Sequence, residues 1–460
     1  MKLLRALQPA LIGRQGLARL PRPLSIRAVP RAAALCARQD YSTFQDVEKP
    51  PDGTHIARPR VQTGSQPGEA ITITYGGKPG GSPRSFRMGS MWLRDNCRCT
   101  ECVNQDTMQR DLDTFAIPED IHPTKVSSEE LGVSVLWSDG HKSHYDWDFL
   151  GAHTIYRDRL HKDEDDGSRR VLWGAEVAKN PPTVDYSSVM ASEDGVAALT
   201  SYIKRVGFVF VQNTPYDDPE KTRELLERIA FIRITHYGGF YDFIPDLAMA
   251  DTAYTNLALP AHTDTTYFTE PAGLQAFHML SHQPAPGASA GETDLGGQSL
   301  LVDGFMAAKV LREEDPVSFR NLAHGSVPWH ASGNKGITIA PDKLYPVIER
   351  AQGSDGVHRI RWNNSDRGVH PLGMQCSSAK WYTAARKWNE ILKRKEMEYW
   401  FQLKPGTVLI FDNWRVLHGR SAFTGIRRIC GGYINRDDFI SRWRNTNYPR
   451  KQILREVMGL

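Results

Sequence analysis

The stretch 259-LPAHTDTTYF-268 places a histidine and an aspartate two positions apart, at His262 and Asp264. On a β-strand, residues i and i+2 point to the same face, so both side chains would reach one metal ion. The pattern alone is weak. The chain holds three His-x-Asp pairs, and its composition predicts roughly 1.7 by chance. The other two begin at His144 and His161, so the surrounding sequence has to distinguish them.

A second histidine for such an ion is His418, in 411-FDNWRVLHGRSAF-423. It follows an apolar segment, 405-PGTVLIFDN-413, that is typical of a buried strand. Two histidines and one carboxylate on one face of an octahedron leave three adjacent positions open, as in non-haem Fe(II) oxygenases. Two of these positions suit the 2-oxo acid end of 2-oxoglutarate, and the third suits dioxygen. The alternative for each histidine is an ordinary hydrogen-bonded structural residue.

The distal carboxylate of 2-oxoglutarate then needs a cationic partner. Arginine suits it, because its planar guanidinium binds a carboxylate through two hydrogen bonds and keeps its charge. Arg427, nine residues after His418, is the candidate. Taken alone, Arg427 is equally consistent with a surface charge, so the prediction depends on the four residues together.

The segment 171–460 has alternating helix and strand signals. Helices are predicted over 192–206, 218–232 and 378–400, and strands over 207–213, 297–304 and 405–413. We expect mainly β structure with flanking helices (α+β). No repeat of solenoid period is present.

Three cysteines cluster in 92-WLRDNCRCTECVNQ-105, at Cys97, Cys99 and Cys102. Three thiolates plus a fourth ligand match a structural zinc site, and His141 and His144 follow about 40 residues later. The alternative is three reduced thiols in a loop. Short strands predicted at 70–77, 85–93 and 133–140 make residues 55–160 a small β-rich domain that holds this cluster.

The first 39 residues hold seven arginines, one lysine and no acid, which is the composition of a mitochondrial presequence. We therefore predict a transit peptide over 1–42, cleaved near Cys36 to Ser42, and a mitochondrial matrix location. A disordered basic tail for nucleic acid is the alternative. Without these eight charges the formal net charge falls from +4 to −4, so the remaining chain has no general attraction to nucleic acid. No apolar run approaches the roughly 18 residues of a membrane span.

Several segments together resemble the 2-oxoglutarate-dependent dioxygenases of carnitine biosynthesis, over about residues 85–440. The segments are WLRDNCRCTEC, DTAYTNLALPAHTDTTYF, SLLVDGF and FDNWRVLHGRSAFTGIRRICGGY. The resemblance implies a double-stranded β-helix (jelly-roll) catalytic domain after a small zinc-binding domain, and a homodimer. It also implies iron ligands His262, Asp264 and His418, the 2-oxoglutarate arginine Arg427, and zinc ligands Cys97, Cys99, Cys102 and His141.

The resemblance also implies a substrate with a trimethylammonium group, which aromatic faces bind. By similarity the aromatic cage would be Tyr237, Tyr241, Tyr254 and Tyr433. Tyr241 stands where the family has tryptophan, and ordinary packing is the alternative for any single tyrosine.

The other end of the substrate separates two branches of the family. Asp251 stands where the γ-butyrobetaine enzymes have asparagine, and a carboxylate there would attract the α-ammonium of trimethyllysine. The alternative is a loop aspartate that forms a turn. Asn363 and Asn364 are candidates for the substrate carboxylate.

We therefore expect hydroxylation of N6,N6,N6-trimethyl-L-lysine at C3, with Fe(II), 2-oxoglutarate, dioxygen and ascorbate as reductant. Succinate and CO2 would be the other products. One alternative is hydroxylation of γ-butyrobetaine. The other is a metal-binding or sensor protein without turnover, which an intact triad with Arg427 argues against.

Overall fold

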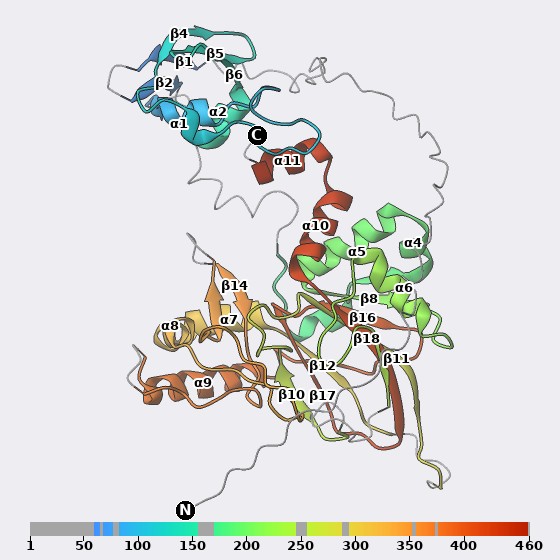
Figure 1. The fold of residues 1–460 in the computed structure, drawn as a ribbon. Helices are drawn as coiled ribbons and strands as arrows, with labels where there is room; N and C mark the ends of the chain where they lie inside the picture. The colour runs from blue at the N-terminus through green and yellow to red at the C-terminus, as the bar shows by residue number, and fades with distance from the viewer. Residues whose placement is uncertain are drawn as a thin grey trace, which may run out of the picture.

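The computed structural model describes residues 59–64, 68–76, 82–154, 170–244, 255–287, 294–351, 356–372 and 376–458. The predicted transit peptide and two of the predicted substrate residues, Asp251 and Tyr254, lie outside these ranges. The described residues form a smaller part within 59–154 and a larger part within 170–458, which Figure 1 shows at opposite ends of the molecule. The predicted domain boundaries, 55–160 and 171–460, stay predictions.

The smaller part contains two three-stranded antiparallel sheets, β1-β2-β3 and β4-β5-β6. Its elements are β1 (Arg60–Thr63), β2 (Glu69–Tyr75), β3 (Arg84–Gly89), α1 (Ser90–Asp95), η1 (Thr114–Ala116), β4 (Pro123–Ser128), β5 (Gly132–Trp137), β6 (Lys142–Asp146) and α2 (Trp147–Thr154). Val133, Val135 and Trp137 of β5 are buried at every second position. They pack in one core with Ile71 and Ile73 of β2, so the two sheets share a hydrophobic interior.

The strand predicted over 85–93 is wrong in its second half. The structure ends β3 at Gly89 and begins helix α1 at Ser90. Ser90, Leu93 and Arg94 are the buried residues of this turn, which is helical spacing and not alternation. The helix carries the chain directly to the cysteine cluster.

The larger part contains two facing sheets and a separate hairpin, with strand orders β7-β8-β16-β11-β18-β9, β10-β17-β12-β15 and β13-β14. The strands are β7 (Thr183–Asp185), β8 (Phe208–Gln212), β9 (Tyr241–Phe243), β10 (Leu259–His262), β11 (Leu274–Gln283), β12 (Ser299–Asp303), β13 (Ile348–Arg350), β14 (Val357–Ile360), β15 (Tyr399–Phe401), β16 (Val408–Asp412), β17 (Val416–Arg420) and β18 (Ile426–Ile434). Neighbouring strands are far apart in sequence, as crossovers between the sheets of a jelly roll require. The predicted mainly β, jelly-roll fold is confirmed.

Alternation along the strands separates the interior from the outer layers. Leu301 and Val416 of the four-stranded sheet pack against Phe208, Phe411 and Ile429 of the six-stranded sheet, in the space between the two sheets. Helices cover both outer faces in Figure 1. They are α4 (Tyr186–Ala191), α5 (Glu193–Val206), α6 (Glu220–Ile229) and α10 (Arg436–Asn447) toward the six-stranded sheet, and α7 (Gly304–Glu314), α8 (Pro316–His324) and α9 (Ser378–Leu392) toward the four-stranded sheet. The short helix η3 (Ala175–Lys179) lies beside edge strand β15.

Helix α5 confirms its sequence prediction. Ser192 caps its N-terminus by accepting a hydrogen bond from the Gly195 N–H at 3.1 Å, and Gly207 ends it with φ +95°. Its apolar stripe, which includes Val196, Leu199 and Ile203, packs on the six-stranded sheet.

Helix α9 is shorter than predicted. The sequence pattern predicts a helix over 378–400, whereas the structure ends it at Leu392. Arg394 pairs with Glu314 at the end of α7, and Tyr399 to Phe401 then form edge strand β15 against β12. Sheet pairing with a distant segment therefore overrides a local helical pattern.

A buried ion pair fixes the turn that precedes His418. Arg415 donates to both carboxylate oxygens of Asp303 at 3.0 and 2.7 Å, and both side chains are almost fully buried. Asp303 ends β12 and also caps α7 by accepting from the Phe305 N–H. The β16–β17 turn is therefore held against the start of α7.

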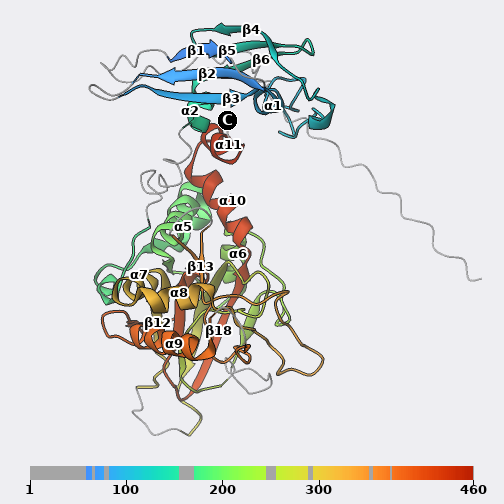
Figure 2. The ribbon, with the colours of Figure 1, turned by 90° about the vertical axis from the view of Figure 1, so that its left-hand side faces the viewer.

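The last helix, α11 (Arg450–Met458), lies beside the smaller part in both views (Figures 1 and 2). Arg98 donates to the Met458 carbonyl at 3.1 Å, and Arg455 pairs with Asp148 at 2.7 Å. The C-terminal helix thus joins the two parts. Within the described ranges, no helix is both long enough and apolar enough to cross a membrane.

Candidate active site

Three predicted iron ligands meet between the two sheets. His262 ends β10 and pairs in register with His418 of β17, and Asp264 follows two residues later. The Asp264 Oδ1 atom lies 3.2 Å from His262 Nε2 and 4.0 Å from His418 Nε2. Each residue offers one ligand atom, and the three atoms lie within 4.8 Å of one another. Two imidazoles and a carboxylate at this separation fit one Fe(II) ion with positions left open.

Partners of the ligands fix their orientation. His262 Nδ1 lies 2.8 Å from the Pro260 carbonyl, so Nδ1 carries the proton and Nε2 keeps its lone pair. The other Asp264 oxygen, Oδ2, accepts from Gln275 Nε2 at 2.7 Å and from the Tyr433 hydroxyl at 2.8 Å. Asp264 Oδ1 is therefore the oxygen directed at the histidines.

The backbone around Asp264 is strained, and hydrogen bonds hold it in place. Thr265, the next residue, has φ +56°, which costs a β-branched residue about 1–3 kcal/mol. Asn413 holds the peptide on both sides, since its Oδ1 accepts from the Asp264 N–H at 2.8 Å and its Nδ2 donates to the Asp264 carbonyl at 2.9 Å. The sharp turn places the carboxylate beside His262.

Burial and neighbouring groups shift the pKa values of His418 and Asp264 toward the forms that bind metal. Burial, together with the neighbouring His262, lowers the pKa of His418 to about 3. Burial raises the pKa of Asp264, but the hydrogen bond with His262 and the charge of His418 outweigh it and leave that pKa below its ordinary value. A neutral imidazole and an ionised carboxylate are the forms that bind metal.

The triad forms one wall of a cavity. Its described lining residues are Tyr237, Tyr241, Phe243, Leu259, His262, Asp264, Tyr267, Gln275, Phe277, Ser299, Leu300, Asn363, Asp366, Leu403, Leu409, His418, Gly419, Arg420, Arg427, Ile429 and Tyr433.

Two buried arginines face this cavity. Arg427 is 5% exposed and has no carboxylate partner among the described residues. Burial lowers its pKa to about 9, with repulsion from Arg420 as the second cause. Arg420 is 8% exposed and donates to the Thr255 and Leu257 carbonyls at 2.7 and 3.0 Å. Two buried cations at one end of a cavity make a site for an anion.

Arg420 was not predicted from the sequence, although its spacing from His418 indicates it. Arg420 lies two residues after His418 on β17, and side chains at that spacing share a face of the strand.

The structure gathers some of the predicted substrate residues. Tyr237, Tyr241 and Tyr433 line the cavity, and the rings of Tyr241 and Tyr433 are 6.0 Å apart. Tyr267, which the sequence analysis missed, joins them, with its hydroxyl 3.4 Å from that of Tyr237. Four tyrosines therefore surround one region of the cavity.

The two predicted carboxylate-binding asparagines separate. Asn363 lies on the cavity wall, whereas Asn364 is exposed and is not among the lining residues. Asp366, three residues after Asn363, also lines the cavity and was not predicted.

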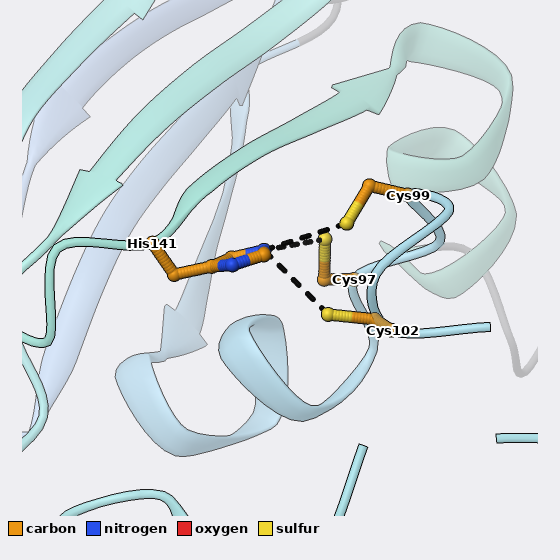
Figure 3. Close-up of side chains that lie close together, drawn as sticks. All are labelled: Cys97, Cys99, Cys102 and His141. Carbon is orange, nitrogen blue, oxygen red and sulfur yellow. Dashed lines mark hydrogen bonds between the residues drawn. The ribbon is translucent and has the colours of Figure 1, made fainter. Parts of the chain in front are cut away.

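The cysteine cluster forms a second candidate metal centre, in the smaller part. Figure 3 shows the sulfurs of Cys97, Cys99 and Cys102 converging on His141. The three Sγ atoms lie 3.4, 3.6 and 3.5 Å from His141 Nε2. Zn–S bonds of ~2.3 Å and a Zn–N bond of ~2.0 Å at a tetrahedral angle give an S–N separation of about 3.5 Å. The donor set fits a four-coordinate zinc ion.

His144, the other histidine considered, stays outside this cluster. Its side chain is exposed, and its Nδ1 lies 3.0 Å from the Ser134 hydroxyl. Arg94 adds a donor to the cluster, with its Nη1 3.5 Å from Cys102 Sγ, and is itself held by Asp139 at 2.8 Å. Such contacts stabilise thiolate ligands.

Two family models match this chain. The model of the taurine catabolism dioxygenase TauD, TfdA family matches residues 165–433, and the gamma-butyrobetaine hydroxylase-like N-terminal model matches residues 68–151. A trimethyllysine dioxygenase of Neurospora crassa is 61% identical, over 80% of this chain and 83% of its own.

Two further relatives are more distant. A trimethyllysine dioxygenase of Meyerozyma guilliermondii is 38% identical, over 85% of this chain and 96% of its own. The human protein named trimethyllysine dioxygenase, mitochondrial, is also 38% identical, over 77% of this chain and 82% of its own.

Proposed function

Because the chain belongs to the trimethyllysine dioxygenase family, within the TauD, TfdA dioxygenases, we propose that it hydroxylates N6,N6,N6-trimethyl-L-lysine at C3. It is an Fe(II)- and 2-oxoglutarate-dependent dioxygenase, and the reaction consumes 2-oxoglutarate and O2 and yields succinate and CO2. One observation carries the proposal: the two-histidine, one-carboxylate triad shares one cavity with a buried arginine that pairs with no carboxylate among the described residues.

His262, Asp264 and His418 would hold the iron. Bound Fe(II) supplies the activation of O2, with ascorbate keeping the metal reduced. The protein would supply neutral Nε2 atoms and one carboxylate oxygen as ligands. The Pro260 carbonyl orients the His262 ring, and Gln275 and Tyr433 orient the Asp264 carboxylate.

Arg427 would bind the distal carboxylate of 2-oxoglutarate. With a pKa of about 9 it stays protonated at neutral pH. Buried in an apolar wall with Phe423 beside it, it forms a strong charge-assisted pair because little water competes for the carboxylate.

Tyr237, Tyr241, Tyr267 and Tyr433 would hold the trimethylammonium group, which has no N–H to donate and is bound by ring faces. Tyr433 also donates to Asp264, so substrate contact and ligand orientation share one residue. The roles proposed for Asp251 and Tyr254 rest on the sequence resemblance, and Asn363 is the candidate for the substrate carboxylate.

Zinc in the Cys97, Cys99, Cys102 and His141 cluster would be structural, since four protein donors leave no position for a substrate. A mitochondrial matrix location draws support from the basic first 39 residues and from the printed name of the human relative. A homodimer is the assembly that the family resemblance implies.

The test is a mass-spectrometric assay of the full chain with Fe(II), ascorbate, 2-oxoglutarate and air, offered trimethyllysine and γ-butyrobetaine in parallel. We expect one added oxygen on trimethyllysine, with an equal amount of succinate. Oxygen on γ-butyrobetaine alone would keep the iron chemistry and overturn the substrate. Absence of product from both would favour a non-catalytic metal-binding protein.

A further inference from the structure

Arg361 is a fully buried arginine that is not among the described lining residues of the cavity. It follows strand β14, and its guanidinium carbon lies 4.1 Å from the centre of the Tyr345 ring. Its Nε lies 3.5 Å from Glu349 Oε1. Burial lowers its pKa to about 10, so it stays protonated at neutral pH. A buried cation with one long ion pair is stable only if hydrogen-bond acceptors surround its other N–H groups.

These acceptors are three backbone carbonyls of the turn that carries Tyr267. Arg361 Nη1 donates to the Thr266 carbonyl and, at 2.7 Å, to the Phe268 carbonyl. Its Nη2 donates to the Thr269 carbonyl at 3.1 Å. Neither a helix nor a strand includes this turn, and within the described part of the chain the three carbonyls accept from no other donor. Arg361 therefore fixes the backbone on both sides of Tyr267.

Tyr267 is one of the four tyrosines proposed to hold the trimethylammonium group. Its side chain is buried, lines the cavity and donates from its hydroxyl to that of Tyr237 at 3.4 Å. A ring attracts a cation only through its face and only within about 6 Å, so the contact is sensitive to small shifts of the backbone. The position of this ring depends on the turn that Arg361 holds.

A different set of hydrogen bonds holds Asp264, the iron ligand that precedes the turn. Asn413 accepts from the Asp264 N–H and donates to the Asp264 carbonyl. Thr263 and Trp362 are joined by two bonds, from the Thr263 N–H at 2.8 Å and from the Trp362 N–H at 3.0 Å. None of these bonds involves the Arg361 side chain. A change at Arg361 should therefore disturb the tyrosine and leave the metal ligands in place.

We infer that Arg361 is a positioning residue, which sets the face of Tyr267 toward the trimethylammonium group of the substrate. The inference rests on the proposed function. The planar guanidinium sends N–H groups in several fixed directions and so reaches carbonyls spread over four residues. The ammonium of a lysine is a single point of charge and cannot hold all three carbonyls in the same places.

The test compares the unaltered full chain with Arg361→Lys and with Arg359→Lys as the matched control. Arg359 lies two residues earlier and pairs with the same Glu349 at 2.8 and 2.6 Å, but it donates to none of the three carbonyls. Three constants are measured for each protein. They are the KM for trimethyllysine, the KM for 2-oxoglutarate, and the Kd for Mn(II) added to the iron-free protein with its zinc retained.

We expect Arg361→Lys to raise the KM for trimethyllysine by about 5- to 20-fold, which corresponds to the loss of one ring contact. The KM for 2-oxoglutarate and the Kd for Mn(II) should stay within about twofold. Arg359→Lys should leave all three constants within about twofold. A purely structural defect would lower the melting temperature and the amount of active protein without this selective rise.

A double-mutant cycle tests whether Arg361 acts through Tyr267. Tyr267→Leu alone should raise the KM for trimethyllysine by a similar factor. Arg361→Lys added to Tyr267→Leu should change that KM by less than about twofold, because no ring remains to be positioned. Effects that multiply in the double variant would show that Arg361 acts elsewhere and would overturn the inference.

The remaining outcomes separate the inference from the proposed function. If the unaltered chain does not hydroxylate trimethyllysine, the proposed function fails. If it does, and Arg361→Lys leaves the KM for trimethyllysine unchanged or raises all three constants together, the inference alone is overturned. Should Arg361→Lys fail to fold, Arg361→Gln decides by the same cycle, since it removes the buried charge and leaves Glu349 paired with Arg359. If neither variant folds while Arg359→Lys does, the role is structural and the inference is overturned.

Discussion

The two candidate metal centres use similar donors in opposite ways. The cysteine cluster brings four donors together at nearly equal separations and would enclose a zinc ion. The iron triad brings three donors to one side of a cavity, and its Asp264 depends on Gln275, Tyr433 and the strained Thr265 for its position. A closed site holds a part of the fold together, whereas an open site needs supporting residues and leaves room for reactants.

Removing an iron ligand is the strongest test of this contrast. His262→Ala should lower turnover by about a thousandfold or more, because two protein ligands hold Fe(II) poorly. The additional open coordination position on the iron would also disturb chelation of the cosubstrate. Zinc content should stay at that of the unaltered chain. Metal analysis and succinate release measure both, and loss of zinc together with iron would show that the two centres are not independent.

Arg427 tests the open site from its far end. Arg427→Gln should raise the KM for 2-oxoglutarate by about 100-fold, because the distal carboxylate then enters a buried site without a countercharge. Arg427→Lys should give a smaller rise, since a point charge replaces a planar fork. Initial rates at varied 2-oxoglutarate measure this. An unchanged KM would transfer the role to Arg420.

The closed site should show the reverse pattern. Cys97→Ser should remove zinc and destabilise the smaller part by about 3 kcal/mol or more, since metal binding contributes directly to folding. Iron occupancy and kcat should change little. Calorimetry with metal analysis checks both, and a variant that retained full zinc would contradict the ligand set.

The smallest expected effect concerns a buried histidine, His278, which belongs to neither candidate metal centre. His278, fully buried with Nδ1 2.7 Å from the Thr222 hydroxyl, has its pKa lowered by burial to about 4. Its ordinary pKa is 6.5, so the unfolded chain binds the proton more readily than the folded chain does. The contribution of neutral His278 to the free energy of unfolding is complete above about pH 6.5. The free energy of unfolding falls by up to about 3 kcal/mol as the pH drops toward 4.

In the measurement for His278, thermal unfolding is followed between pH 7 and pH 4.5. His278→Asn should flatten this part of the pH dependence, although it lowers stability at pH 7 because the buried ring is lost. An unchanged slope in the variant would assign the acid sensitivity to other groups, such as the metal ligands.

The sequence predicted the parts of the site that follow from local geometry. His262 and Asp264 share a face through strand spacing, and the strand before His418 is apolar from Val408 to Phe411. The jelly-roll class came from the family resemblance.

The site residues that were not predicted from the sequence are those that only the tertiary fold brings to the cavity. Gln275 orients Asp264 from β11 and Asn413 from the β16–β17 turn, and Asp366 reaches the cavity from a loop 100 residues beyond Thr266. No spacing rule connects them. Spacing left His141 and His144 both open for the same reason, because the hairpin between β5 and β6 sets which histidine faces the cysteines.

The contact between Arg98 and Met458 has a consequence for how the chain is made. It joins residues 360 positions apart, so the face of the smaller part that receives α11 is synthesised long before its partner. At about 5–20 residues per second, the roughly 300 residues after α2 take on the order of 15–60 s to synthesise. During that interval the newly made smaller part has only its own core, and the metal ion that its cysteine cluster would bind, to stabilise it.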